Sequence, residues 1–286
     1  MKIFETVSST REHIHALTDK HKRIGFVPTM GALHEGHLSL VSRAAIENDN
    51  VVVSIFVNPI QFNNPDDLEK YPRDLEADVR LLQPYLKDDD IIFAPSPAEM
   101  YPRPETHQYD FGTLANVMEG RFRPGHFNGV GVVVNKLFRI VEPQTAYFGE
   151  KDFQQLAIIK CLTVIEELPV QIIPCEIVRE PDGLAMSSRN VRLTTDYRSI
   201  APMIYQAISH AAANIDLGTP LELKKIIAKT LNRTGLEVEY VEFADETSLQ
   251  PVKRWNESDN IRCFIAVQAG EIRLIDNVKC PKQFGR

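Results

Sequence analysis

Cysteine is scarce in this chain. The 286 residues contain only Cys161, Cys175, Cys263 and Cys280, which are widely spaced and form no CxxC pair. This spacing argues against a zinc site, which needs closely grouped ligands. We expect four free, buried thiols, as a reducing cytosol allows.

Long apolar runs and excess positive charge are also absent. No run approaches the roughly 18 residues of a membrane span. The opening stretch, MKIFETVSSTREHIHAL, lacks the uninterrupted apolar core of a signal peptide. We therefore expect a cytoplasmic protein with no membrane partner. The net charge of -7 argues against nucleic acid as a partner, although it leaves room for a local basic pocket.

The first part of the chain alternates between two patterns. Short runs rich in Val, Ile and Phe are typical of buried parallel strands: RIGFVPT, VVVSIFVN, DIIFAP, TAYFGE and VQIIPCEIV. Helical patterns follow or separate them: HLSLVSRAAIEN, RDLEADVRLLQPYL, VGVVVNKLFRIV and DFQQLAIIKCLTVIEEL. This alternation predicts an α/β fold, a doubly wound parallel-sheet (Rossmann-like) domain over residues 1–177. Such sheets bind ligands beyond the carboxyl ends of their strands.

The pattern changes near residue 178. TTDYRSIAPMIYQAISHAAANI and PLELKKIIAKTLNR predict two helices, and LEVEYVEFA, IRCFIAVQAG and EIRLIDNV predict strands with a turn at Ala269-Gly270. Residues 178–286 should form a smaller α+β domain, for which we expect a lid role. We expect Asp88–Asp90 to lie in a solvated loop before a strand.

The stretch PTMGALHEGHLSL carries the strongest chemical signal. It follows the apolar run Ile24–Val27, which we take as the first strand, and a helix should begin near Gly36. Gly31 and Gly36 allow the backbone to approach a ligand closely. A helix N-terminus favours phosphate, and His34 and His37 there can donate hydrogen bonds to its oxygens. An isolated HxxH would more often be incidental, but the strand–glycine–helix context favours a phosphate site.

Two later stretches also suit a nucleotide. In FGEKDFQQ, Lys151 supplies a point charge for phosphate, and Asp152 can accept from a ribose hydroxyl or hold a water on a metal. In GLAMSSRN, Ser187, Ser188 and Arg189 have the composition of a phosphate clamp. Either stretch alone is weak, since capping residues and Ser-rich loops are common.

Two loops carry polar residues suited to a small substrate. Gln61, in VNPIQF, can grip a hydroxyl or a carboxylate without adding charge. Arg123 and His126, in GRFRPGHFNGV, can meet an anion or can be loop residues without a role.

Taken in order, PTMGALHEGHLSL, NPIQF, RPGHFNGV, YFGEKDFQQL and MSSRN resemble the pantothenate synthetase (pantoate–β-alanine ligase) family. This family belongs to the nucleotidylyl-transferase superfamily, which shares the HxGH motif and includes the class I aminoacyl-tRNA synthetases. The resemblance is close from about residue 24 to 192. It implies an ATP-dependent ligase that forms pantoyl adenylate and pyrophosphate, and then pantothenate and AMP when β-alanine attacks.

The resemblance also implies roles for individual residues. It places the ATP site on Met30, Gly31, Ala32, Leu33, His34, Glu35, Gly36, His37, Gly149, Glu150, Lys151, Asp152, Val178, Met186, Ser187, Ser188 and Arg189. Catalysis falls to His34, His37 and Lys151. Pantoate is held by Gln61 and Gln155, with Arg123 and His126 in the pocket loop. Mg²⁺ is implied through the ATP phosphates, with unknown protein ligands, and the family's habit is a homodimer.

Two other functions remain open at this point. An adenylyltransferase would use the same HxGH chemistry but leave AMP on its product, so it would not release AMP when β-alanine is added. A nucleotide-binding regulatory protein would need to have lost a catalytic group, yet the expected histidines, lysine and serines are all present.

Overall fold

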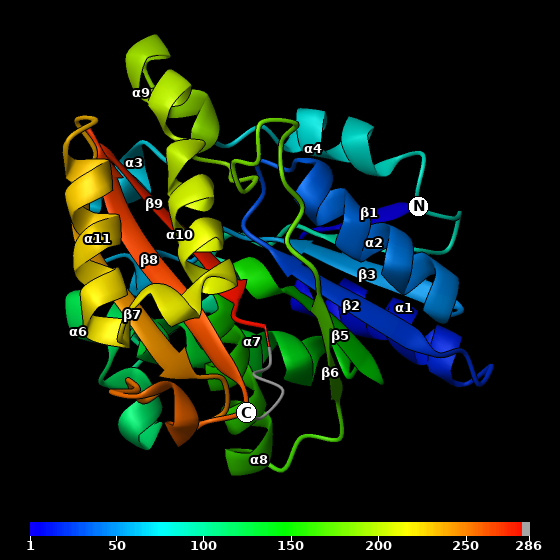
Figure 1. Cartoon of the computed structure of the whole chain (residues 1–286). Coiled ribbons are helices and arrows are strands. Elements are labelled where there is room, and N and C mark those ends of the chain that lie inside the picture. Colours follow the sequence, from blue (N-terminus) through cyan, green and yellow to red (C-terminus); the bar gives the residue numbers. More distant parts are fainter. Residues whose placement is uncertain (282–286) are drawn as a thin grey trace. The chain divides into compact units, whose positions relative to one another are not determined.

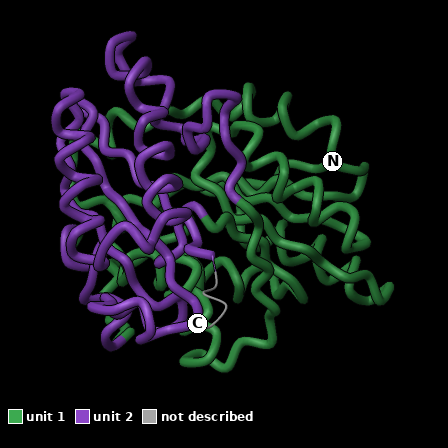
Figure 2. Tube along the Cα trace, in the orientation of Figure 1, with its two compact units in different colours: residues 1–111, 123–150, 155–176 green, residues 112–122, 151–154, 177–286 purple. Residues whose placement is uncertain are grey.

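The chain forms two compact units, coloured separately in Figure 2. The computed structural model describes residues 1–281. Unit 1 contains residues 1–111, 123–150 and 155–176, and unit 2 contains residues 112–122, 151–154 and 177 onward. The domain boundary at 177/178 stays a prediction, and residues 282–286 of its second domain lie outside the described residues.

Unit 1 is built on a six-stranded sheet in the order β1-β4-β3-β2-β5-β6, and every pair of neighbours is parallel (Figure 1). The strands are β1 (Lys2–Phe4), β2 (Ile24–Thr29), β3 (Asn50–Ile55), β4 (Ile91–Phe93), β5 (Thr145–Gly149) and β6 (Gln171–Cys175). The predicted doubly wound, Rossmann-like sheet is therefore confirmed.

Helices cover both faces of this sheet because both faces of its central strands are apolar. On one face, Val27, Val53 and Tyr147 share a buried cluster with α2 and α4. On the other, Phe26 and Phe148 pack against Phe138 of α7, with ring centroids 6.1 and 6.3 Å away. The helices placed in this unit are α1 (Val7–Thr18), α2 (Glu35–Glu47), α3 (Pro65–Glu69), α4 (Leu75–Leu82), α5 (Pro97–Met100), α7 (His126–Val141) and most of α8 (Phe153–Ile165).

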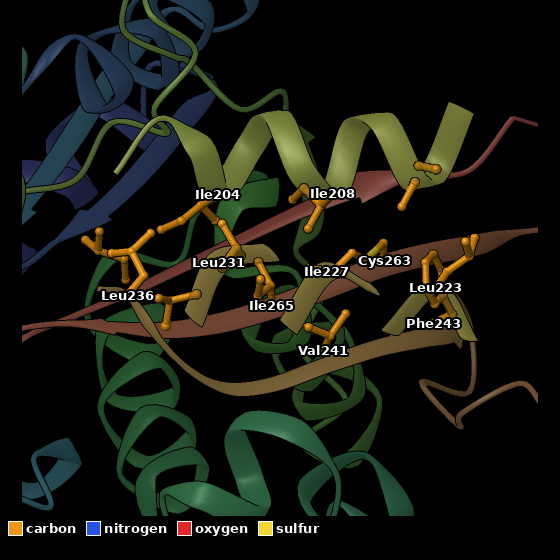
Figure 3. Close-up of a cluster of buried hydrophobic side chains, with 14 of the residues drawn as sticks. Ile204, Ile208, Leu223, Ile227, Leu231, Leu236, Val241, Phe243, Cys263 and Ile265 are labelled. Carbon is orange, nitrogen blue, oxygen red and sulfur yellow. The ribbon is translucent and has the colours of Figure 1, made fainter. Parts of the chain in front are cut away.

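Unit 2 contains an antiparallel sheet in the order β7-β8-β9, formed by β7 (Glu237–Asp245), β8 (Ile261–Ala269) and β9 (Ile272–Lys279). Gly270 takes a φ of +64° in the turn between β8 and β9, a conformation that favours glycine. The helices are α6 (Met118–Phe122), α9 (Thr195–Ile200), α10 (Met203–Ala213) and α11 (Pro220–Asn232). Helices α10 and α11 bury Ile208 and Ile227 against Ile265 of β8 (Figure 3).

A buried ion network explains why residues 112–122 group with unit 2. The two terminal guanidinium nitrogens of Arg273 on β9 donate to the carboxylate of Glu119, each at 2.7 Å. The hydroxyl of Tyr240 donates to the same carboxylate at 2.8 Å. The amide of Gln154 donates to the carbonyl oxygens of Leu114 and Val117. These contacts fix both short segments to the C-terminal sheet.

Three local predictions are wrong. Lys2–Phe4 is the first strand, and Ile24 begins the second; β1 is a short, largely exposed edge strand and leaves no clear pattern. One predicted helix is two, α9 and α10, separated at Ala201-Pro202. The third prediction, a solvated loop at Asp88–Asp90, is wrong only at Asp90: Asp88 and Asp89 are exposed in a loop before β4, whereas Asp90 is buried and its carboxylate accepts from the N–H groups of Val51 and Lys87 at 2.9 and 2.7 Å.

Candidate active site

The sheet of unit 1 has one point where the strand order reverses. β2 lies between β3 and β5, and the chain moves outward to β3 and β4 on one side and to β5 and β6 on the other. In open α/β sheets, ligands bind beyond the carboxyl ends of the strands at such a point. The chain leaving β2 carries the HxGH motif, and the chain leaving β5 carries GEKDFQQ.

The two histidines lie at the start of α2, as predicted. His34 is the N-cap residue, and its Nδ1 accepts a hydrogen bond from the N–H of Gly36 at 3.1 Å. Because Nδ1 accepts, the proton of a neutral His34 ring must be on Nε2, which is then a donor. The rings of His34 and His37 are neighbours, with centroids 4.1 Å apart. The helix therefore begins with two neighbouring imidazoles at the positive end of its dipole, an arrangement that suits phosphate.

A buried carboxylate fixes the loop before these histidines. Asp78, on α4, accepts from the N–H of Ala32 at 3.0 Å and from the N–H of Leu33 at 2.7 Å. Burial raises the pKa of Asp78 above its usual range, against the lowering effect of those two hydrogen bonds. Gly31 has a φ of +76°, and a Cβ there would come within 2.8 Å of the Asp78 carboxylate. Gly31 is therefore needed for the loop conformation.

Gln61 lies in a chain of polar contacts. It ends η1 (Pro59–Gln61) and is 8% exposed, and its Nε2 donates to the sulfur of Met30 at 3.0 Å. Its Oε1 accepts from the amide of Asn58 at 3.0 Å, and Asn58 in turn accepts from the hydroxyl of Tyr101 at 2.7 Å. The structure thus brings together Met30 and Gln61, for which the family resemblance implies contacts with ATP and with pantoate.

The remaining predicted pocket residues of unit 1 differ in exposure. His126 begins α7 and is buried, and its Nδ1 must donate to the carbonyl oxygen of Gln61, 2.9 Å away, because a carbonyl can only accept. His126 therefore supports the backbone of Gln61. Arg123 is half-buried in the loop before α7, and its carbonyl oxygen accepts from the N–H of His126. Gln155 is half-buried in the first turn of α8.

The chain after β5 passes from unit 1 to unit 2. Gly149 and Glu150 belong to unit 1, and η3 (Glu150–Asp152) carries Lys151 and Asp152 into unit 2. The ammonium of Lys151 lies 3.9 Å from the carboxylate of Asp152. The backbone carbonyl oxygen of Lys151 accepts from the side-chain amide of Asn277 at 3.0 Å.

The predicted phosphate-binding loop GLAMSSRN of unit 2 is part of a small hairpin, which we define as residues 178–190. An isolated antiparallel bridge joins Arg179 to Ala185, and the N–H of Met186 donates to the carbonyl oxygen of Val178 at 3.0 Å. Val178 and Met186 are therefore neighbours across the hairpin. The residues that follow, Ser187, Ser188 and Arg189, are half-buried and lead into η4 (Asn190–Arg192).

Sequence reasoning missed several residues that support the candidate site. Asp78 and Asn277 gave no motif signal, since each reads as one polar residue within a helical or strand pattern. Asn58 lies in the same VNPIQF stretch as Gln61. Its place three residues before Gln61 was the signal that could have identified it. Tyr101 is far from every motif in the sequence.

The described residues, 1–281, contain neither a membrane-spanning helix nor a cluster of metal ligands. Within that range, none of the helices is both long and apolar enough to cross a membrane. The same range contains no group of three or more His, Cys, Asp or Glu residues placed to hold a metal ion. All four cysteines are free; Cys161 is partly exposed and the other three are buried.

A doubly wound sheet with HxGH at its switch point defines the chain as a nucleotide-binding α/β protein. A model of the pantoate–β-alanine ligase family matches residues 2–279. The chain belongs to the pantoate–β-alanine ligase family. It is therefore an enzyme, a ligase that uses ATP to join pantoate to β-alanine.

Similar proteins agree along the whole chain. The pantothenate synthetase of Porphyromonas gingivalis is 49% identical over 280 residues, covering 98% of this chain and 99% of the relative. That of Phocaeicola vulgatus is 48% identical over 283 residues, covering 98% and 99%.

Solved structures agree as well. A pantothenate synthetase from Thermus thermophilus matches with a TM-score of 0.89 and 40% identity, covering 98% of this chain and 100% of that one. A pantoate–β-alanine ligase from Francisella tularensis, complexed with β-γ ATP and β-alanine, matches with a TM-score of 0.82 and 38% identity, covering 97% of each chain.

Proposed function

We propose that the reaction passes through pantoyl adenylate. A carboxylate oxygen of pantoate attacks the α-phosphorus of ATP, and the bond to the β-phosphate breaks to release pyrophosphate. The amine of β-alanine then attacks the acyl carbon, loses a proton, and expels AMP. The observation that carries this proposal is the HxGH helix start at the switch point of the sheet.

The histidines are proposed to stabilise charge during the first step. A leaving pyrophosphate bound to Mg²⁺ needs charge stabilisation more than it needs a proton. We therefore assign His37 as a hydrogen-bond donor to phosphate, rather than as the proton donor that the family resemblance implies. The Nε2–H of His34 is assigned the same task, because its Nδ1 is already used at the helix cap. Met30–Leu33, Glu35 and Gly36 would form the rest of this part of the ATP site.

Gln61 is proposed to hold pantoate, with Gln155 as its partner. The side-chain amide of Gln61 is held at both ends, because its Nε2 donates to Met30 and its Oε1 accepts from Asn58. Its conformation is therefore set before substrate binds. A preorganised neutral amide can bind a hydroxyl or a carboxylate without a change of charge. His126 would contribute by supporting Gln61, and Arg123 by meeting the anion.

Unit 2 is proposed to supply the remaining nucleotide contacts. Lys151 would place its ammonium on the phosphates, with Gly149, Glu150 and Asp152 also contacting ATP. Val178 and Met186 would contact the nucleotide, and Ser187, Ser188 and Arg189 would donate to phosphate oxygens.

Mg²⁺ is proposed to enter as part of the MgATP substrate. Mg²⁺ usually keeps several waters and is bound by substrate phosphates with one or two carboxylates, rather than by an all-protein cage. Such an arrangement needs no all-protein cage, and residues 1–281 contain no group of three or more His, Cys, Asp or Glu side chains that could hold a metal ion.

We further propose a cytoplasmic homodimer. The free thiols suit a reducing compartment, and the family resemblance suggests the dimer. Light scattering should give a mass twice the 32.4 kDa of one chain. A mass of one chain at micromolar concentration would contradict the dimer.

The test of the proposed function is product analysis. With ATP, Mg²⁺, pantoate and β-alanine, we expect AMP, pyrophosphate and pantothenate in equal amounts. Without β-alanine, no AMP should be released, and release of pyrophosphate should stop after one turnover. AMP retained on the product would indicate an adenylyltransferase, and absence of turnover would indicate a regulatory nucleotide-binding protein.

A further inference from the structure

Asn277 lies in the interior of β9 and is 2% exposed. Its amide Nδ2 donates to the carbonyl oxygen of Lys151 at 3.0 Å, and its Oδ1 accepts from a guanidinium nitrogen of Arg262 at 2.6 Å. Arg262 also stacks on the ring of Phe153, 4.1 Å from the ring centroid. The backbone of Lys151 is therefore attached to the sheet of unit 2 through one oriented amide.

The preceding residue, Asp276, makes a second attachment. Its carboxylate accepts two hydrogen bonds from the guanidinium of Arg179, at 2.7 and 2.9 Å. Arg179 is the residue next to Val178, and it also donates to the carbonyl oxygen of Gly183 in the same hairpin at 3.1 Å. Its guanidinium lies over the ring of Tyr205 on α10, 3.7 Å from the centroid.

Neighbouring residues of a strand face opposite sides of the sheet. Asp276 accordingly faces α10 and the hairpin 178–190, whereas Asn277 faces the segment that contains Lys151. Both side chains are buried, and a buried carboxylate or amide is costly unless it is bonded. Apolar side chains at these two buried positions would be enough to pack the sheet. The polar side chains are therefore better explained by the segments that they bind, the hairpin and the backbone of Lys151.

We propose that Asn277 is a positioning residue for Lys151 in ATP binding, and that Asp276 serves the hairpin with Met186–Arg189 in the same way. One strand thus fixes both nucleotide-contacting segments of unit 2. This inference rests on the proposed roles of Lys151 and the hairpin.

The sharpest variant is Asn277→Asp. It keeps the volume and the acceptor for Arg262, removes the donor to the Lys151 carbonyl oxygen, and adds an ionisable carboxyl group. We expect the KM for ATP in pyrophosphate release to rise about tenfold, the scale for leaving a buried acceptor without its partner. The KM for pantoate should stay unchanged. Asn277→Ala removes the same donor without adding charge, and it gives the test if the first variant does not fold.

The matched control is Asn232→Asp, on α11 of the same unit. The Oδ1 of Asn232 accepts from the N–H of Val238 at 2.9 Å, so the substitution leaves that bond in place. The control should keep the wild-type KM for ATP. Equal KM values for ATP in Asn277→Asp and the control would overturn the inference, as would parallel rises in the KM for ATP and for pantoate.

A double-variant cycle shows whether Asn277 acts through Lys151. In a Lys151→Ala background, Asn277→Asp should change the KM for ATP less than twofold. Fully additive effects would show a general structural role and overturn the inference. A wild-type KM for ATP in Lys151→Ala alone would instead overturn the proposed role of Lys151, and the inference with it.

Discussion

At the residue scale, the two histidines of the HxGH motif have different structural duties. The Nδ1 of His34 caps α2 by accepting from the N–H of Gly36, which leaves the Nε2–H of the ring as the group that we propose to bind phosphate. His37 lies inside the first turn and makes no such cap. Loss of His34 should therefore affect stability and activity, whereas loss of His37 should affect chiefly activity.

His34→Asn separates these two effects. Asparagine is among the best N-cap residues, so this variant should retain most of the unfolding free energy, whereas His34→Ala should lose about 0.5–2 kcal/mol. Both should lower kcat by about 10²-fold, the scale for losing one donor to developing charge. Urea unfolding and steady-state rates give the two readings. An active His34→Asn enzyme would contradict the donor role of Nε2.

His37→Ala is the companion variant. Its kcat for pyrophosphate release should fall by about 10²-fold or more, because a donor to the phosphates is lost. Its urea midpoint should change less than that of His34→Ala. A near wild-type kcat would remove His37 from the mechanism.

At the scale of elements, helix α4 supports the loop between β2 and α2 through Asp78. Asp78 accepts from two successive backbone N–H groups of the loop between β2 and α2. The orientation of that loop determines where α2 begins, and so where the histidines lie. The contribution of α4 is therefore to fix the backbone of this loop.

Asp78→Asn should weaken this support. An amide replaces one acceptor oxygen by a donor, so one loop N–H loses its partner, at a cost of about 1–3 kcal/mol. We expect a lower urea midpoint, and a higher KM for ATP with a smaller change in the KM for β-alanine. An unchanged KM for ATP in a destabilised variant would show that the loop keeps its conformation without Asp78.

The pH dependence of the same variant has a definite sign. The pKa of Asp78 is raised in the folded state, mainly by burial. Its contribution to stability is therefore complete below the unfolded pKa of about 3.9 and falls as pH rises through the folded value. The deficit of Asp78→Asn should be larger at about pH 4 than at about pH 7. A deficit that grows with pH would mean that the folded pKa is lowered instead.

Elements buried on both faces were predictable from the sequence, and others were not. The central strands, such as Val51–Val53 and Ala146–Phe148, are continuous apolar runs because helices cover both sides. The edge strand β1 and the break at Pro202 carry weaker signals. The motif residues can be proposed from the sequence because they are contiguous, but Asp78 and Asn277 bind backbone atoms 46 and 126 residues away. Such contacts exist only in the folded chain.

At the scale of the whole molecule, the proposed ATP ligands are divided between two units. His34 and His37 belong to unit 1, and Lys151 and Ser187 belong to unit 2. If all four serve the nucleotide phosphates, unit 2 is required for the first half-reaction. Loss of the unit 2 contacts should have a smaller effect on the second half-reaction, in which β-alanine attacks pantoyl adenylate that has already formed.

Lys151→Ala and Ser187→Ala test this division. Each should slow adenylate formation, measured as pyrophosphate release in a single turnover, by about tenfold or more. Each should leave the attack of β-alanine on preformed pantoyl adenylate within about twofold of the wild-type rate. Equal damage to both half-reactions would show that these residues also serve acyl transfer.

The central claim is that the pantoate carboxylate attacks the α-phosphorus of ATP. The chain has no GxxxxGK[ST] loop of the kind used to transfer a γ-phosphate. Pantoate labelled with heavy oxygen in its carboxylate should therefore give AMP that carries one labelled oxygen, because that oxygen leaves with the phosphate when β-alanine expels AMP. Mass spectrometry of the nucleotide product reads the result directly. Unlabelled AMP, or ADP with the label in inorganic phosphate, would contradict the mechanism.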